Sequence, residues 1–229
     1  MVNTRVENML TLKRLFWPWI QKDHVHFASS PNDLQKIRLP ELNLAIYQRT
    51  PDIQLQTAVR ALVASSFTKM ELLVDTATDF PLQIRHQLAL RTSLPHQQIE
   101  SLASDINTFT LLFSQVCESN SLKLYLKTVT DDSCRKFHID GYAYRLFCSY
   151  FGSGTEWMYN DNVNRKYLGL GENEQIVKNW KRIERLDTFD VAILKGERPS
   201  QRNGNGIVHR SPPIEQKNEK RLILRIDSQ

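Results

Sequence analysis

The sequence predicts an α+β protein, with a double-stranded β-helix (jelly roll) in the C-terminal half and N-terminal helices packed on one of its sheets. Two observations support this fold class. Residues 51–120 carry apolar side chains at spacings of three and four, which is typical of amphipathic helices. Residues 121–229 contain short alternating segments separated by Gly, Pro and Asn clusters, which is typical of two packed sheets.

Length and charge limit the organisation and the partners. A chain of 229 residues is long enough for one domain with a sizeable core. We therefore expect a single domain over 1–229, mainly helical over 1–120 and with the jelly-roll core over 121–229. The net charge of +5 is spread along the chain, without a basic stripe or a nucleic-acid-binding motif. We expect a solvated basic surface and no nucleic-acid partner, and an anionic substrate is compatible with this charge.

The composition also predicts where the protein works. No run approaches eighteen apolar residues, and residues 1–20 lack the continuous apolar core of a secretory signal. The three Cys residues are odd in number and not closely paired, which predicts reduced thiols. Together these features predict a cytoplasmic protein without a membrane partner, and they leave its oligomeric state open.

Helical patterns dominate the first half of the chain. A helix start at 30–34 precedes a short alternating strand at 42–46. A helix then opens at the Pro-Asp pair of 51–52 and carries apolar residues on one face. We expect residues 69–91 to be helical with a break at their proline, and a longer helix to begin at about residue 95 and continue to about residue 116.

Short strands replace the helical pattern near residue 121. Residues 122–127 alternate apolar and polar side chains, and 144–151 form an apolar run that ends at a Gly-Ser-Gly turn. Segment 157–185 contains six Lys or Arg residues, and we interpret it as a mobile substrate lid, with a solvated excursion as the alternative. Further short strands are predicted at 167–170, 190–195, 207–210 and 221–227.

His138 and Asp140 form a His-x-Asp pair. Because side chains alternate faces along a strand, an imidazole and a carboxylate at this spacing lie on the same side. A neutral imidazole from a distant strand, such as His209, would complete a two-His-one-carboxylate set. Such a set occupies one face of a metal ion and leaves the other positions open, which suits non-haem iron. The alternative is a surface His beside a turn Asp.

The last predicted strand places apolar residues on one face and Arg221 and Arg225 on the other. If the apolar face meets the helices, the Arg face points into the barrel, where a guanidinium needs a partner. A bound carboxylate, held by the planar guanidinium fork, would supply that partner. The alternative is an edge strand whose Arg side faces water.

Taken together, these residues resemble the iron(II)/2-oxoglutarate-dependent oxygenases. His138-x-Asp140, then His209 about seventy residues later, then an Arg on the following strand occur in the order of that superfamily. Several blocks are more closely similar to a bacterial family of uncharacterised proteins, domain of unknown function 1826. These blocks are CRKFHID (134–140), YRLFCSYFGSGTEW (144–157), DVAILKGE (190–197), GIVHRSPP (206–213) and RLILRID (221–227).

The resemblance implies an enzyme that uses iron(II) and 2-oxoglutarate to hydroxylate a C–H bond of a small molecule or of a protein side chain. It implies that His138, Asp140 and His209 are the metal ligands, and that Arg221, or less well Arg225, binds the cosubstrate. One departure is that Lys-Arg-Leu at 220–222 lacks the Gly and Ser of the superfamily's Gly-x-Arg-x-Ser segment. The metal set is therefore better supported than the cosubstrate site.

Two other functions stay open from the sequence, a non-catalytic Zn(II)-binding or metal-handling protein and a cupin-like metal enzyme without 2-oxoglutarate. Cys134 could contribute a thiolate to a zinc site, although a structural cysteine is the commoner outcome. Glu156 could reach the cavity, hold a ligating His from behind, or lie at a surface turn. We expect His24 and His26, which lack a third ligand nearby, to be surface residues.

Overall fold

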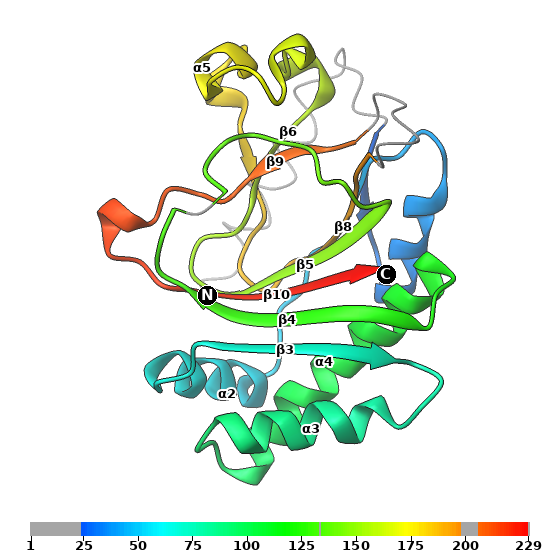
Figure 1. Cartoon of the computed structure of the whole chain (residues 1–229), viewed down its shortest axis with the longest axis vertical. Helices are drawn as coiled ribbons and strands as arrows, with labels where there is room; N and C mark the ends of the chain where they lie inside the picture. The colour runs from blue at the N-terminus through cyan, green and yellow to red at the C-terminus, as the bar shows by residue number, and fades with distance from the viewer. Residues whose placement is uncertain (1–23, 133, 198–205, 229) are drawn as a thin grey trace, which may run out of the picture.

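The computed structural model describes residues 24–132, 134–197 and 206–228, which form a large sheet, a small sheet and a helical layer (Figure 1). The large sheet has seven strands in the order β1-β2-β8-β5-β10-β4-β3. Its neighbours pair antiparallel except β1 and β2, which are parallel. The strands are β1 (Val25–Ala28), β2 (Leu44–Tyr47), β3 (Lys69–Asp75), β4 (Ser121–Val129), β5 (Tyr144–Phe151), β8 (Val191–Lys195) and β10 (Arg221–Ser228).

The small sheet has the order β7-β6-β9 and lies across from the middle of the large one (Figure 1). It consists of β6 (Glu156–Met158), β7 (Glu184–Arg185) and β9 (Val208–Arg210). A single antiparallel bridge between His138 and His209 extends it by one residue pair. Because β1, β2 and β3 precede residue 121, the first half of the chain contributes more to the large sheet than its helical pattern indicated.

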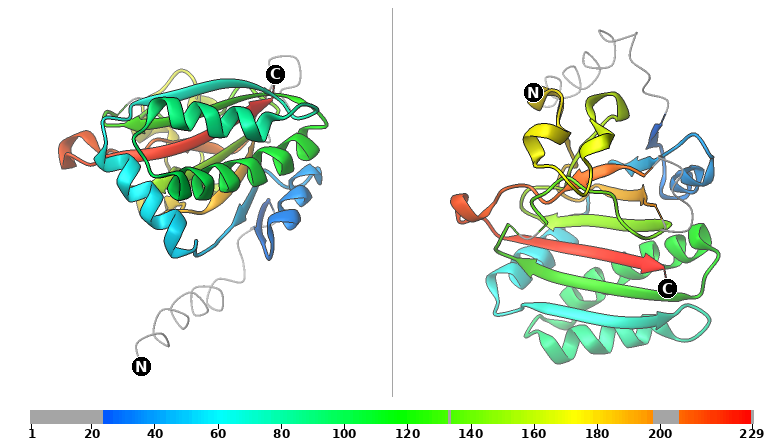
Figure 2. Two further views of the ribbon diagram at one scale, coloured as in Figure 1. Left: turned by 90° about the horizontal axis from the view of Figure 1, so that it is seen from below. Right: turned by 45° about the horizontal axis from the view of Figure 1, so that its top comes forward.

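Helices cover the face of the large sheet that points away from the small sheet (Figure 2). They are α2 (Ile53–Ala64), α3 (Phe80–Arg91), α4 (His96–Cys117) and the 3-10 helix η1 (Pro31–Arg38). Asp52 and Asp79 cap α2 and α3 by accepting from the backbone N–H groups of Leu55 and Leu82. One core cluster joins buried residues of α2, α3 and α4 to Leu222, Leu224 and Ile226 of β10. The mixed α/β class and the packing of helices against the apolar face of the last strand are thus confirmed.

The prediction of helix throughout 69–91 is wrong at its start. Residues 69–75 form β3, whose Met70, Leu72 and Val74 are buried between exposed neighbours. This period of two is a strand signal, and pairing with β4 supplies the hydrogen bonds that a helix would otherwise make. Pro81 does not break the helix, because it lies in the first turn of α3, where no backbone donor is lost.

The strand predicted at 167–170 is also wrong. The 3-10 helix η3 (Arg165–Tyr167) occupies its start, and Gly169 then adopts a left-handed backbone conformation that ends regular structure. The rest of 157–185 contains η2 (Asn160–Asn162), the single turn α5 (Asn173–Ile176) and η4 (Trp180–Arg182). A fifth 3-10 helix, η5 (Glu215–Lys217), precedes β10.

Segment 157–185 packs on its own small core rather than extending into solvent. Met158, Val163, Ile176 and Val177 form a buried cluster together with Phe137 and with Val208 of β9. The buried Asn162 side chain donates to the carbonyls of two residues in the second half of the segment. The mobility of the segment stays a prediction, but its packing favours a structural role.

Among the described residues, no helix combines the length and apolar character needed to cross a bilayer.

The burial of Asp190, immediately before β8, predicts a pH dependence of stability. Burial raises the pKa of its carboxyl to about 6. Since the folded pKa exceeds the unfolded value, this group stabilises the fold fully below about pH 4 and loses that contribution as the pH rises through about 6. Asp190→Asn cannot ionise and its amide oxygen can still accept from the backbone N–H of Asp187, which lies 2.8 Å from the carboxylate.

We therefore expect Asp190→Asn to gain stability relative to the wild type between pH 4 and pH 7.5, by at most about 3 kcal/mol. Urea denaturation at both pH values measures this difference. Asp75→Asn, at an exposed position, serves as the control and should show no such trend. Parallel pH profiles of Asp190→Asn and wild type would contradict the prediction.

Candidate active site

The pairing of two distant segments brings His138 and His209 together. The backbone N–H of each donates to the carbonyl of the other at 3.0 Å, and their ring centroids lie 4.7 Å apart. Asp140 follows two residues after His138 on the same side of the chain. Among the described residues, these three form the one group of His, Cys, Asp or Glu side chains whose ligand atoms all lie within 4.8 Å of one another.

Both imidazoles present Nε2 to the centre of this group. Nδ1 of His138 lies 2.9 Å from the carbonyl oxygen of Lys136, and Nδ1 of His209 lies 3.2 Å from that of Ile207. A carbonyl oxygen can only accept, so Nδ1 carries the proton in each neutral ring. The lone pair of each Nε2 is therefore available to a metal ion, and the backbone fixes the orientation of both rings.

Asp140 supplies the carboxylate and is buried. Its Oδ2 lies 3.3 Å from Nε2 of His209 but has no hydrogen-bond partner in the described part of the chain, and its Oδ1 lies 3.6 Å from Nε2 of His138. Two acceptors that face each other at this distance need a cation between them, either a proton or a metal ion. The three side chains therefore fit a divalent metal, with the carboxylate and two neutral imidazoles as donors.

Arg145 on β5 forms an ion pair with Asp140. Its NH1 group donates to Oδ1 of Asp140, and its Nε and NH2 groups donate to the two oxygens of Asp227 at 2.5 and 3.1 Å. Burial raises the pKa of Asp140, but His209, His138 and Arg145 outweigh it and hold that pKa well below its usual range. The carboxylate is therefore ionised at neutral pH, as metal binding requires.

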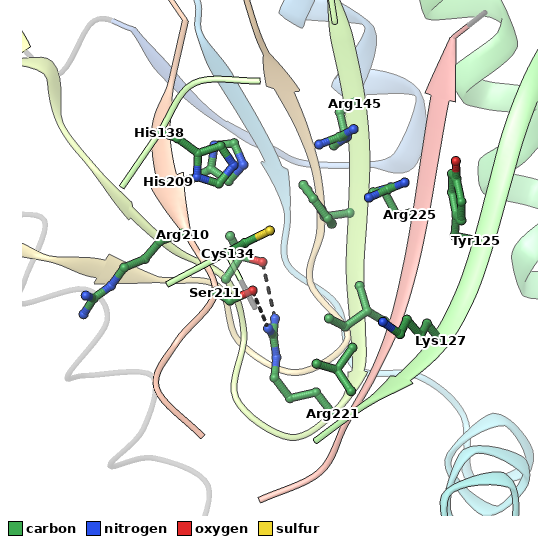
Figure 3. Close-up of a pocket in the computed structure, with 14 residues that line it drawn as sticks. Tyr125, Lys127, Cys134, His138, Arg145, His209, Arg210, Ser211, Arg221 and Arg225 are labelled. Carbon is green, nitrogen blue, oxygen red and sulfur yellow. Dashed lines mark hydrogen bonds between the residues drawn. The ribbon is translucent and has the colours of Figure 1, made fainter. Parts of the chain in front are cut away.

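A cavity of about 160 Å³ lies between the two sheets beside this group (Figure 3). Its wall comes from β4, β5 and β10 of the large sheet and from β9 of the small one, with both imidazoles at its edge. Among the described residues, no Asp or Glu lines it. Its cationic lining residues are Lys127, Arg145, Arg210, Arg221 and Arg225.

Arg221 is 1% exposed and has no carboxylate partner among the described residues. Within the described ranges its guanidinium donates only to hydroxyl oxygens, those of Ser149 at 3.2 Å and of Thr155 and Ser211 at 3.4 Å, and its Nε has no partner there (Figure 3). Burial lowers the pKa of Arg221 to about 10, so the group is still charged at neutral pH. A buried guanidinium without a counter-ion is costly, and a bound carboxylate would supply the missing charge.

Arg225 lines the same cavity but in a different setting. Its guanidinium lies over the ring of Tyr125, 3.9 Å from the centroid, and its Nε is 3.2 Å from Oδ2 of Asp227. The two arginines thus differ, since Arg225 has a carboxylate within ion-pair distance and Arg221 has none among the described residues.

Glu156 and Cys134 lie outside the metal group. The Glu156 carboxylate is buried on β6 and pairs with Arg185 and Arg210 at 2.5 and 2.7 Å, so it neither reaches the cavity nor lies at a surface turn. Cys134 is exposed, with a positive φ of 65°, and lines the cavity without joining the cluster of ligand atoms.

His24 and His26 lie apart from the site. Nε2 of His24 accepts from the backbone N–H of Asn160, and Nε2 of His26 is 2.8 Å from Asp33. The expectation that His24 is a surface residue is wrong, because it is buried. No residue of 157–185 lines the cavity, so the structure does not place that segment as a lid over it.

Sequence reasoning missed Arg145 and Asp227. The alternation of side chains along β5 and β10 could have found them. Arg145 lies two residues before Phe147, and Asp227 lies two residues after Arg225, so each shares a strand face with a residue that lines the cavity. The register places Asp227 directly opposite Arg145, a pairing that neither segment shows by itself.

Residues 28–227 match the family model described as "Protein of unknown function (DUF1826)". The chain belongs to the DUF1826 family. This match confirms the family suggested by the blocks at 134–227 and extends it over most of the chain. No curated protein matches this DUF1826 chain.

Solved structures are similar to this DUF1826 protein at the level of the fold. A dioxygenase for auxin oxidation from rice has a TM-score of 0.50 at 12% identity, over 89% of this chain and 81% of that one. Two further similar structures are dioxygenase for auxin oxidation 1 from Arabidopsis thaliana in a 2-oxoglutarate complex (0.43, 11%, over 89% and 91%) and a Pseudomonas putida prolyl-4-hydroxylase (0.41, 9%, over 86% and 97%). The rice enzyme shows that the DUF1826 chain shares an overall fold with an oxygenase.

Proposed function

We propose that this DUF1826 protein is an iron(II)- and 2-oxoglutarate-dependent oxygenase. One observation carries the proposal: a two-His-one-carboxylate group and a buried arginine without a counter-ion border the same cavity. A zinc-handling protein would need the two-His-one-carboxylate group but not the buried arginine. A cupin-like metal enzyme without 2-oxoglutarate would likewise leave Arg221 unpaired.

The strand order supports a jelly roll as the finer fold assignment. From β4 onward, eight segments are divided four and four between the sheets, if the bridge at His138 is counted as one of them, and successive segments change sheet except β6 and β7, which both lie in the small one. In the large sheet they lie in the order β8-β5-β10-β4, and in the small sheet β7-β6-β9 is followed by His138. Two four-stranded layers connected in this way form a double-stranded β-helix.

In this proposal His138, Asp140 and His209 hold the iron, and Arg221 binds a carboxylate of the keto acid. Bound iron supplies the redox chemistry, with open positions for O₂ and cosubstrate. Arg145 keeps the Asp140 carboxylate ionised and oriented, since it donates to the oxygen Oδ1 and leaves Oδ2 free. The hydroxyls of Ser149, Thr155 and Ser211 hold the guanidinium in place in the wall of the cavity.

Anaerobic titration of the iron(II) protein with 2-oxoglutarate tests the proposal. We expect a visible charge-transfer band and saturable binding, with Arg221→Gln weakening binding roughly ten- to a hundredfold while metal content is unchanged. A charge-assisted hydrogen bond contributes about 1.5–3 kcal/mol, which corresponds to this factor. Arg221→Lys should restore binding only in part, because an ammonium lacks the two-pronged geometry.

Arg60→Gln is the matched control, because it also removes one guanidinium but lies on the exposed face of α2. This variant should bind 2-oxoglutarate as the wild type does. If the wild type holds stoichiometric metal but binds no keto acid, the oxygenase proposal fails. The metal-handling or cupin-like function would then take its place.

A further inference from the structure

The end of the cavity around Arg225 carries positive charge that neither the metal nor the keto acid uses. We propose that this is the binding site for an anionic group, a carboxylate or a phosphate, on the primary substrate, with Lys127 and Arg225 as the residues that bind it. The inference rests on the proposed oxygenase function and names the substrate class of that site.

Arg221 and Arg225 lie at different places along the cavity. They lie on the same face of β10, four residues apart, so their Cα atoms are separated by about 13 Å. Arg221 is enclosed by hydroxyl groups at one end of the cavity, whereas Arg225 lies between Arg145 and Tyr125 (Figure 3). A carboxylate held by Arg221 therefore leaves Arg225 available to a second anion.

Asp227 does not satisfy Arg225. Both oxygens of Asp227 already accept hydrogen bonds from Arg145. Nε of Arg225 is within ion-pair distance of Asp227 but has no hydrogen-bond partner. The Tyr125 ring holds the guanidinium plane from one side, so the group is oriented and its donors are only partly used.

Lys127 adds a further cation to this end of the cavity. It lies on β4 opposite Ile223, which separates the two arginines along β10, and its side chain is exposed. No carboxylate of the described residues lies within ion-pair distance of it, and its neighbour across β3 is another cation, Lys69. Lys69 already pairs with Glu71, so Lys127 is the cation of this pair that a bound anion would neutralise.

The charge balance of the cavity also favours an anionic ligand. Its wall carries four cations other than the Glu156-paired Arg210, namely Lys127, Arg145, Arg221 and Arg225. Two carboxylates, Asp140 and Asp227, contact them, which leaves an excess of two positive charges. A divalent metal and a doubly charged keto acid cancel each other, so the excess persists when both are bound. A positive potential in a cleft favours anionic ligands and repels cations.

Calorimetric titration of the full-length protein, loaded with Zn(II) and saturated with 2-oxoglutarate, tests this inference. The probes are phenyl phosphate and benzoate, with benzamide as the neutral analogue. We expect both anions to bind at least tenfold more tightly than benzamide. We expect Lys127→Gln to weaken anion binding several-fold and Arg225→Gln to weaken it roughly tenfold, without loss of 2-oxoglutarate affinity.

Lys127→Gln alters an exposed side chain, so it keeps the test valid even if Arg225→Gln lowers the melting temperature. The control pair Arg60→Gln with Lys181→Gln removes two exposed cations that do not line the cavity and should leave binding unchanged. The inference is overturned if the anions bind no better than benzamide, if Lys127→Gln and Arg225→Gln bind them as tightly as the wild type, or if only Arg221→Gln weakens them.

The same titrations separate the two proposals. If 2-oxoglutarate does not bind but anion binding still depends on Lys127 and Arg225, the oxygenase function fails and the anion site stands. If 2-oxoglutarate binds through Arg221 and binding of the anion probes depends on neither Lys127 nor Arg225, the oxygenase function stands and the inferred substrate class fails.

Discussion

Asp140→Ala and His209→Ala should each lower the affinity for iron(II) by more than a hundredfold and leave the fold intact. Partners that only orient a ligand cost ten- to a hundredfold when they are removed, so loss of a ligand itself should cost more. The fold should survive, because the main core lies between β10 and the helices, on the other side of the large sheet. Metal content after anaerobic dialysis, together with circular dichroism, gives both quantities.

The matched control for these variants is His26→Ala. It removes an imidazole that pairs with Asp33 at the edge of the sheet, away from the cavity, and should keep full metal content. His138→Gln adds a finer test, since its amide oxygen is a weaker ligand than an imidazole. Full stoichiometric metal in all three site variants would show that the ion binds elsewhere.

Asp105→Ala should destabilise the protein by about 3 kcal/mol, the largest stability effect we expect from a single polar side chain. Asp105 on α4 forms a two-pronged ion pair with Arg49, which follows β2, and accepts from the hydroxyl of Tyr150 on β5 at 2.7 Å. Both partners of the ion pair are nearly buried, with 11% and 12% of their side-chain surface exposed. Removing one partner leaves a buried charge without compensation, which typically costs 3–5 kcal/mol.

Urea denaturation measures this loss, and a melting temperature lower by roughly 6–12 °C should accompany it. Glu71→Ala breaks the exposed pair with Lys69 and should change stability by less than about 1 kcal/mol. Replacing both partners with apolar residues, Arg49→Met with Asp105→Leu, should recover much of the loss. If Asp105→Ala is as stable as Glu71→Ala, the buried pair contributes no more than a surface one.

Local periodicity was sufficient to predict several elements. The spacing of apolar residues in α4 and the alternation of Leu222, Leu224 and Ile226 each depend on a few neighbouring residues. The failures were at 69–75, where the sequence carried a period-two alternation whose pairing with β4 was missed, and at 167–170, where a left-handed glycine ends regular structure. A strand at the edge of a sheet is stabilised by its partner, and that partner was fifty residues away in the chain.

The features of the candidate site likewise divide into those that the sequence predicted and those that only the structure showed. The sequence by itself determined the family, the His-x-Asp spacing and the two arginines of the last strand, because each depends on residue order or on strand alternation. Only the tertiary structure decided that His209 pairs with His138. It also showed that Arg145 connects Asp140 to Asp227. The Glu156 carboxylate, in turn, forms ion pairs with Arg185 and Arg210. The tertiary structure also distinguished Arg221 from Arg225, which look alike along the strand and differ only in the side chains around them. The physical reason is that charge compensation acts through space, between groups that the register of the sheets brings within a few ångströms of each other.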